Sequence, residues 1–179
     1  APYPRSLEDR RHCEYYSELA REAGLETQIV ELAEIRLRRA DGAFLDHQGE
    51  PVEVLFKIYP WEMMAQDRFS VHLLESGMQL IEPAWKFILS NKALLPMLWE
   101  MFPCCPWLLR SQWQPTGMDA FVAKPIFSRG GENVTVVKGG RVLAHTQGTY
   151  GRYPLIYQEL GELAEFDGRR VVLGSWVVG

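Results

Sequence analysis

The sequence has few cysteines, no excess of basic residues and no long hydrophobic run. Its formal net charge is −4 over 179 residues, and acids and bases are mixed along the chain, whereas a general nucleic-acid binder would show a basic stripe. No apolar run approaches the roughly 20 residues that a membrane-spanning helix needs. We therefore expect neither nucleic acid nor a membrane as a partner.

The three cysteines, Cys13, Cys104 and Cys105, are too few for a disulfide framework. Adjacent Cys104 and Cys105 are poorly placed to chelate one metal ion together, and the sequence contains neither C-x-x-C nor H-E-x-x-H. We expect reduced thiols and no metal ligands in this segment. Because no secretory leader pattern is present either, we expect a cytoplasmic protein.

The two ends of the sequence suggest a segment of a longer protein. The chain opens on Ala1 rather than methionine, and it stops in an apolar, strand-like run at 171–178. A strand left bare at a terminus invites aggregation. We therefore expect a fold that is truncated at both ends.

Hydrophobic periodicity and turn residues predict an α/β part over residues 1–85, with a strand–helix–strand pattern. The expected elements are a helix that starts at the capping-box pair Ser6 and Asp9 and ends at Gly24, a strand at 28–32, a hairpin turn at Asp41-Gly42, a strand at 52–59, a helix at 62–76 and a strand at 79–82.

Residues 86–179 are expected to form a second part built mostly of strands. Asn91 is placed to cap a short helix that stops at Pro103, and Pro96 is tolerable there only in the first turn or two. Gly139-Gly140 predicts a hairpin. The expected strands lie at 121–126, 134–138, 141–146, 155–160 and 171–178.

The stretch FVAKPIFSRGGENVTVV, residues 121–137, carries the first candidate site. A strand bearing Lys124 runs into a loop with Arg129 and two glycines, Gly130 and Gly131. Glycines let backbone N–H groups crowd around an anion, and a lysine on the adjoining strand can reach phosphate oxygens. The alternative is a solvent-exposed hairpin loop. The loop is not a P-loop or a Rossmann fingerprint, and a kinase would place its glycines before its lysine.

Two further segments could complete a nucleotide site. In LIYQEL, residues 155–160, the backbone could meet the edge of an adenine while Gln158 or Glu159 meets the exocyclic amine or the ribose; an ordinary edge strand is the alternative. Lys92 sits at a helix start, where its charge opposes the helix dipole. A bound phosphate would explain that position; the alternative, and the more frequent case, is a plain surface lysine.

A third cluster lies in FKIYPWEM, residues 56–63. Lys57 falls inside an apolar strand and needs a partner, for which Glu62 is the local candidate. Together with Trp61 these residues form either a structural ion pair beneath an aromatic core or part of a substrate site.

Taken together, these segments resemble the glutathionylspermidine synthase-like family, which has an ATP-grasp fold, and within it the shorter acid–amine ligase branch. The resemblance spans well over half the chain in matching order. It is carried by LFKIYPWEMM (55–64), EPAWKFILSNKALLPMLWEMFP (82–103), AKPIFSRGGENV (123–134), YQEL (157–160) and LGSWVVG (173–179).

The resemblance implies an ATP-grasp-like fold in the α/β (α+β) class, with residues 1–85 beside the core and 86–179 as an incomplete nucleotide-binding part. The implied ATP contacts are Lys92 and Lys124 on the phosphates, Ser128, Gly130, Gly131 and Asn133 in the covering loop, and Gln158, Glu159 and Leu160 at the adenine, with Leu160 acting mainly through its backbone. Arg129 is the implied catalytic cation. Lys57, Trp61 and Glu62 match the family without a firm role.

The loop departs from the family pattern Ser-Arg-Glu-Gly-Ala-Asn-Val, because Gly130 replaces the glutamate and Glu132 replaces the alanine. The family's magnesium-binding segment is also absent from this sequence, so the Mg²⁺ ligands are expected outside it. The implied function is ATP-dependent amide formation between a small carboxylic acid and an amine through an acyl phosphate. The alternative is a nucleotide-binding or interaction module without catalysis.

Overall fold

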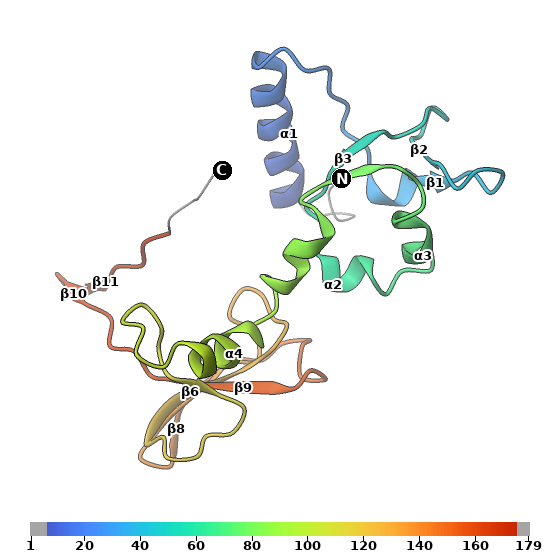
Figure 1. The fold of residues 1–179 in the computed structure, drawn as a ribbon. Helices are drawn as coiled ribbons and strands as arrows, with labels where there is room; N and C mark the ends of the chain where they lie inside the picture. Colours follow the sequence, from blue (N-terminus) through green and yellow to red (C-terminus); the bar gives the residue numbers. More distant parts are fainter. Residues whose placement is uncertain (1–6, 175–179) are drawn as a thin grey trace. The chain divides into compact units, whose positions relative to one another are not determined.

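The computed structural model describes residues 7–174 of the chain. These residues fall into two compact units that meet in sequence between Ser90 and Asn91, and each is described by itself (Figure 1). The fold class is mixed α/β, as predicted, with helices, a small parallel pair and a larger antiparallel sheet. No helix within residues 7–174 combines the length and the apolarity that crossing a membrane requires.

The first unit begins with the predicted helix, α1 (Leu7–Glu22). Cys13 and Ser17 are its buried residues, and the Ser17 hydroxyl lies 2.7 Å from the hydroxyl of Thr27. The helix ends at Gly24, whose φ of +83° lies in the left-handed region that glycine adopts without strain. The aromatic ring of Tyr16 lies 5.0 Å from that of Phe56 and so packs α1 against the following strands.

The strand expected at 28–32 is wrong. Residues 25–31 form no strand, and the chain turns through a short 3-10 helix, η1 (Leu32–Glu34), which a reciprocal Glu31–Glu34 capping box closes. The hairpin predicted at Asp41-Gly42 is confirmed, because β1 (Arg36–Leu37) pairs antiparallel with β2 (Phe44–Leu45) across that turn.

The expected strand–helix–strand unit forms, although its elements are shorter. β3 (Val54–Phe56) pairs in parallel with β4 (Gln79–Ile81). The single helix expected at 62–76 is wrong: the structure has α2 (Trp61–Met64) and α3 (Ser70–Leu73) with turns between them. Met64 and Leu73 are both buried in one core, but nine positions along a continuous helix, at 100° per residue, would put them on opposite faces. The break lets both face inward.

The hydrophobic core of the first unit lies between the hairpin, β3 and these helices. After β4, the short 3-10 helix η2 (Ala84–Ile88) adds Phe87 to the edge of this core. The buried residues of this core are Phe44, Leu55, Tyr59, Trp61, Met64, Leu73 and Met78.

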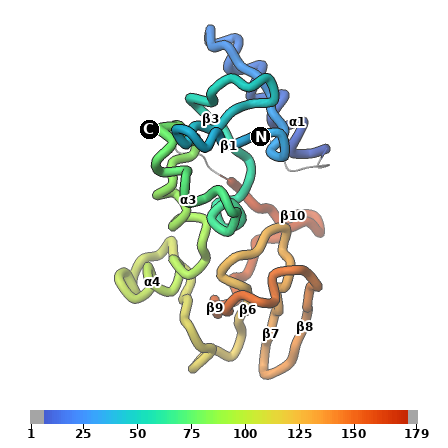
Figure 2. The backbone as a smooth tube through the Cα atoms, turned by 90° about the vertical axis from the view of Figure 1, so that its right-hand side faces the viewer, coloured from blue at the N-terminus to red at the C-terminus, as the bar shows by residue number. Residues whose placement is uncertain are grey.

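The second unit contains a five-stranded antiparallel sheet with the spatial order β5-β9-β6-β7-β8. Four of its strands were predicted, whereas β5 was not, and the two-residue strand at Ser111–Gln112 is too short to show periodicity. The glycine hairpin is confirmed, with φ of +57° at Gly139 and +70° at Gly140. The strands are β5 (Ser111–Gln112), β6 (Ala120–Pro125), β7 (Thr135–Lys138), β8 (Arg141–His145) and β9 (Leu155–Glu159). Figure 2 labels β6 to β9.

The helix of this unit, α4 (Leu94–Met101), also follows the prediction. The side chain of Asn91 accepts a hydrogen bond of 2.9 Å from the N–H of Ala93, and Pro96 is fully buried in the first turn, where it displaces no helical hydrogen bond. The expected strand at 171–178 is absent over residues 171–174, and residues 175–178 lie outside the described residues. Instead β10 (Glu165–Phe166) and β11 (Arg169–Arg170) form a small hairpin.

Candidate functional site

Lys124 lies on β6 in the middle of the large sheet, beside β9 (Figures 1 and 2). Register pairs Lys124 with Ile156, Val122 with Gln158, and Gln158 with Ser111 on β5. Directly paired residues share a face of a sheet. Lys124, Gln158 and Ser111 therefore occupy the same face, one on each of three neighbouring strands.

These three side chains form a connected hydrogen-bond chain. The Lys124 Nζ donates to Gln158 Oε1 over 2.6 Å. Gln158 Nε2 donates in turn to Ser111 Oγ over 3.1 Å, and that hydroxyl donates to the carbonyl of Leu109 over 3.0 Å. Because each group has one defined partner along this chain, the amide of Gln158 is oriented with its oxygen toward the ammonium.

Partial burial of Lys124 has an electrostatic consequence. Desolvation lowers the pKa of its ammonium from the ordinary value of 10.5. A neutral amide oxygen compensates that desolvation less than a carboxylate would. A negatively charged group placed on this face of the sheet would stabilise the ammonium and would raise its pKa again.

Lys92 approaches the same region from the segment that precedes α4. Its backbone N–H donates to the carbonyl of Ile126, just beyond β6, over 2.8 Å. Its Nζ donates to the carbonyl of Ser128 over 2.7 Å. The structure thus attaches Lys92 by its backbone and by its side chain to the loop that follows Lys124 and β6.

The loop after β6 contains three residues with left-handed backbone conformations. Gly130 has a φ of +57°, Gly131 of +74° and Asn133 of +56°. An L side chain is strained in this region, asparagine less than most. The carbonyl of Gly131 accepts a 2.5 Å hydrogen bond from the Thr146 hydroxyl. Arg129 is exposed, and its carbonyl accepts the N–H of Glu132 over 3.0 Å, which closes a turn.

The end of β9 is engaged with neighbouring backbone. The N–H of Glu159 donates to the carbonyl of Arg110 over 2.8 Å, and the N–H of Leu160 donates to the carbonyl of Ala120 over 3.2 Å. These two backbone donors of the expected adenine segment are thus used within the protein. A ligand edge at this position would meet a carbonyl group, or it would replace one of these bonds.

In the first unit, Lys57 is buried with only 2% of its side chain exposed. Its Nζ donates to the carbonyl of Tyr59 over 3.1 Å, lies 3.4 Å from the half-exposed carboxylate of Glu82, and sits 4.3 Å from the ring centre of Trp61. The cation–π contact and the ion pair compensate burial of the charge. Glu62 is also buried, on α2. The structure thus places Lys57 against the ring of Trp61 and beside Glu82, whereas the sequence had suggested Glu62 as its acidic partner.

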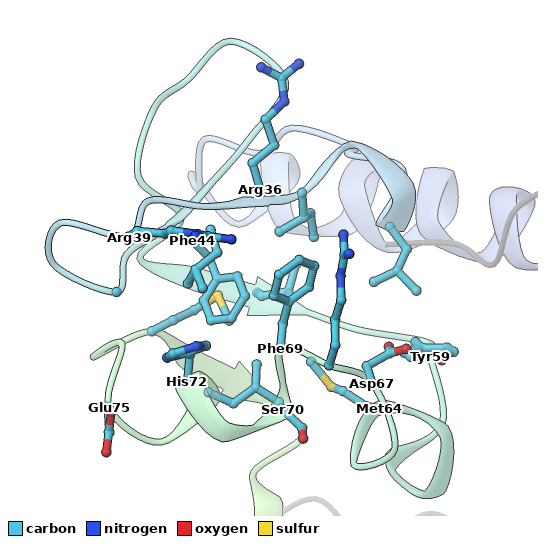
Figure 3. Close-up of a pocket in the computed structure, with 18 of the residues that line it drawn as sticks. Arg36, Arg39, Phe44, Tyr59, Met64, Asp67, Phe69, Ser70, His72 and Glu75 are labelled. Atoms are coloured by element: carbon cyan, nitrogen blue, oxygen red, sulfur yellow. The ribbon is translucent and has the colours of Figure 1, made fainter.

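A large cavity, of about 1650 Å³, opens into the same unit. Figure 3 shows Phe44 and Phe69 facing into it and Arg36 extending away from it. Its lining includes Leu55 and Met78, which belong to the hydrophobic core. The cavity is therefore an opening onto that core, distinct in its composition from the lysine-bearing face of the large sheet.

Several residues that contact Lys124, its partner Gln158 or the glycine loop were not expected from the sequence. Ser111 orients Gln158, yet it lies in a short segment without a recognisable pattern. Thr146, at the end of the strand expected at 141–146, and Thr149, just beyond it, hold the glycine loop, and neither position carries a recognisable motif. Only Glu132 gave a signal, because it interrupts the family loop pattern.

The comparisons with known proteins cover the whole chain. A family model described as "Glutathionylspermidine synthase preATP-grasp" matches residues 1–179. The "Putative acid–amine ligase" of Haemophilus influenzae is 35% identical over 182 aligned positions, which cover 96% of this chain and 46% of that protein. The chain spans less than half the length of this relative.

Two more distant relatives are named for specific syntheses. Trypanothione synthetase of Crithidia fasciculata is 29% identical, with 92% of this chain and 29% of that protein aligned. The bifunctional glutathionylspermidine synthetase/amidase of Escherichia coli is 26% identical, with 98% of this chain and 33% of that protein aligned. With the family model matching from end to end, the chain belongs to the glutathionylspermidine synthase family.

Proposed function

We propose that this chain is the nucleotide-binding part of an ATP-dependent acid–amine ligase with an ATP-grasp-like fold. The relatives' names support the reaction class. The observation that carries the nucleotide assignment is the attachment of Lys92 to the glycine loop that follows Lys124. Ammonium groups and glycine-containing loops whose backbone N–H groups can approach an anion are suited to binding phosphate.

In this proposal the lysines hold the phosphates and the loop covers them. Lys124 would exchange the amide oxygen of Gln158 for a phosphate oxygen, and Lys92 would exchange the carbonyl of Ser128. Both lysines donate to neutral oxygens in the structure, and a charged acceptor makes the stronger hydrogen bond. Gln158, Glu159 and Leu160 would border the adenine, with the carbonyl groups as the available backbone acceptors.

The proposed reaction has two steps. A substrate carboxylate attacks the γ-phosphorus of ATP, which breaks the bond to the β-phosphate oxygen and gives an acyl phosphate and ADP. An amine then attacks the acyl carbon, inorganic phosphate leaves, and the amine loses a proton as the amide forms. Phosphoryl transfer depends mainly on charge neutralisation and alignment, which the lysines and Arg129 would supply, while the loop keeps water from the acyl phosphate.

Mg²⁺ would enter this site with ATP, and its protein ligands would come from outside the described residues. Within residues 7–174, no three histidine, cysteine, aspartate or glutamate side chains gather closely enough to hold a metal ion. We therefore assign no step to Mg²⁺ here. The acid and the amine are proposed as small, peptide-like or polyamine-like molecules, in line with the syntheses for which the relatives are named.

The experiment is a titration of the protein with MgATP, combined with an assay of ADP release when candidate acids and amines are present. The proposal expects ATP binding that requires the phosphates, so adenosine should bind far more weakly. An absence of ATP binding by the intact protein would contradict it.

A second function, a nucleotide-binding module without catalysis, is favoured by one observation. Glu132 lies in the loop and is engaged with Thr149, while the family position for a loop glutamate is held by Gly130. If a loop glutamate takes part in catalysis, it has been lost here. ATP binding without ADP release under any acid and amine pair would support this module.

A further inference from the structure

The C-terminal end of the glycine loop is held by the side chains of Glu132 and Asn133, which accept hydrogen bonds from the backbone N–H groups of Thr149 and Tyr150. Glu132 Oε2 accepts the backbone N–H of Thr149 over 2.8 Å and lies 3.3 Å from the hydroxyl of that residue. Asn133 Oδ1 accepts the N–H of Tyr150 over 2.8 Å. The loop is therefore joined side chain to backbone to the segment after β8.

Close packing supports the same contact. A Cβ built on Gly148 would lie 2.5 Å from both Cβ and Oε2 of Glu132, and 2.6 Å from Oδ1 of Asn133. Real Cβ atoms essentially never approach so closely, so Gly148 is needed for its small size. Thr146 strengthens the attachment, since it donates to Gly131 and accepts the N–H of Val134 over 2.9 Å.

We propose that Glu132 and Gly148 form a clamp that positions the glycine loop for phosphate binding. Glu132 is a positioning residue in this inference, which rests on the function proposed above. Gly130 and Gly131 would otherwise leave the loop with many accessible conformations. Fixing the loop at its far end reduces the ordering cost of binding a ligand, and affinity rises accordingly.

The carboxylate carries a cost as well as a benefit. A negative charge near a triphosphate repels it, so the clamp favours binding only because Thr149 holds Oε2 through hydrogen bonds. A glutamine at position 132 keeps an acceptor oxygen for Thr149 and removes the charge. An alanine removes both. The two substitutions therefore separate the role of the hydrogen bond from the role of the charge.

The test uses the intact protein with four variants: Glu132→Ala, Glu132→Gln, Gly148→Ala and, as a control, Glu100→Ala, which removes an exposed carboxylate from α4. The first readout is the amide hydrogen exchange of Thr149 and Tyr150 without nucleotide. We expect exchange about tenfold faster or more in Glu132→Ala and Gly148→Ala, because their hydrogen bonds open, and near wild-type rates in the other two.

The second readout is the affinity for MgATP and the KM and kcat for ATP. Glu132→Ala and Gly148→Ala should weaken ATP binding about three- to tenfold, the range expected from losing one hydrogen bond, and kcat at saturating ATP should change little. Glu132→Gln should retain or exceed the wild-type affinity. A thermal melt of each variant checks that the fold is kept. Because Gly148 is exposed, we expect Gly148→Ala to remain folded.

The outcomes distinguish a failure of the proposed clamp from a failure of the proposed ATP-binding function. Unchanged exchange at Thr149 in Glu132→Ala would overturn the clamp. Faster exchange with an unchanged ATP affinity would show that the clamp does not position the loop, and would overturn the inference too. If the wild-type protein binds no ATP, the proposed function fails whatever the exchange rates show.

Discussion

Replacing Lys124 with methionine tests the proposed phosphate site at a partly buried cation. Methionine keeps an unbranched chain of similar length and removes only the ammonium. A hydrogen bond to a charged group contributes about 1.5–3 kcal/mol, which corresponds to roughly a 10- to 150-fold weaker affinity for ATP. We therefore expect Lys124→Met to raise the Kd for MgATP within that range.

The same change should affect folding stability little, because two terms oppose each other. The lowered pKa of Lys124 means that the folded protein holds this charge at a cost near pH 7, and methionine removes that cost. Gln158 Oε1, however, loses the donor that lies 2.6 Å away, and an unsatisfied buried acceptor costs about 1–3 kcal/mol. A thermal midpoint close to that of the wild type is the expected result.

Isothermal titration calorimetry with MgATP is the assay, and Lys138→Met is the matched control. Lys138 is an exposed lysine on β7 of the same sheet, so its loss changes net charge equally. A wild-type Kd for Lys124→Met would refute the phosphate role of this lysine. An equal loss of affinity in both variants would mean that overall charge, rather than a contact, governs binding.

Three further predictions follow from the same geometry. First, since the unfolded chain binds one more proton than the folded one between the lowered pKa of Lys124 and 10.5, stability measured by urea unfolding should rise with pH through that window; Lys124→Met should remove this slope, and an unchanged slope would contradict the assignment. Second, Ser111→Ala should weaken ATP binding a few fold, because Gln158 loses the partner that orients its amide. An unaltered affinity by calorimetry would argue against a role for the Lys124–Gln158–Ser111 hydrogen-bond chain in ATP binding. Third, Lys57→Ala should lower the free energy of unfolding by about 2–5 kcal/mol, because it removes a buried side chain that packs against the ring of Trp61 and leaves a cavity, while the half-exposed Glu82 returns to water; a melt that shifts little would refute this.

Local signals in the sequence were sufficient where one residue type decides the backbone. Gly139-Gly140 adopts left-handed conformations in a hairpin, and Pro96 lies in the first turn of a helix as expected. Asn91, which was expected to cap that helix, instead binds the N–H of Ala93 in the turn just before it. These features depend on neighbours only a few residues away. They could therefore be predicted without knowing what packs against them.

Long-range packing decided the elements that were predicted wrongly. The region 62–76 has helical residues throughout, but the core needs both Met64 and Leu73, and a continuous helix cannot bury both. The segment 28–32 has strand-like residues, yet none of the strands described within residues 7–174 pairs with it, so it forms no strand. Neither constraint is visible in a short window of sequence.

The candidate site divides in the same way. Lys92, Lys124 and the glycines were found because their types match phosphate chemistry and a known family. The partners that orient them, Ser111 and Thr149, lie distant in the sequence and carry no characteristic pattern. They could be found only once the strand register was known.

The central claim, that Lys92 and Lys124 bind one triphosphate, can be tested most directly by covalent labelling with an acyl-phosphate derivative of ATP. Such a reagent acylates lysines that lie beside the terminal phosphate, and peptide mass spectrometry identifies them. We predict labelling of Lys92 and Lys124 that excess ATP prevents. Labelling confined to Lys86 or Lys138, or labelling that ATP does not reduce, would contradict the claim.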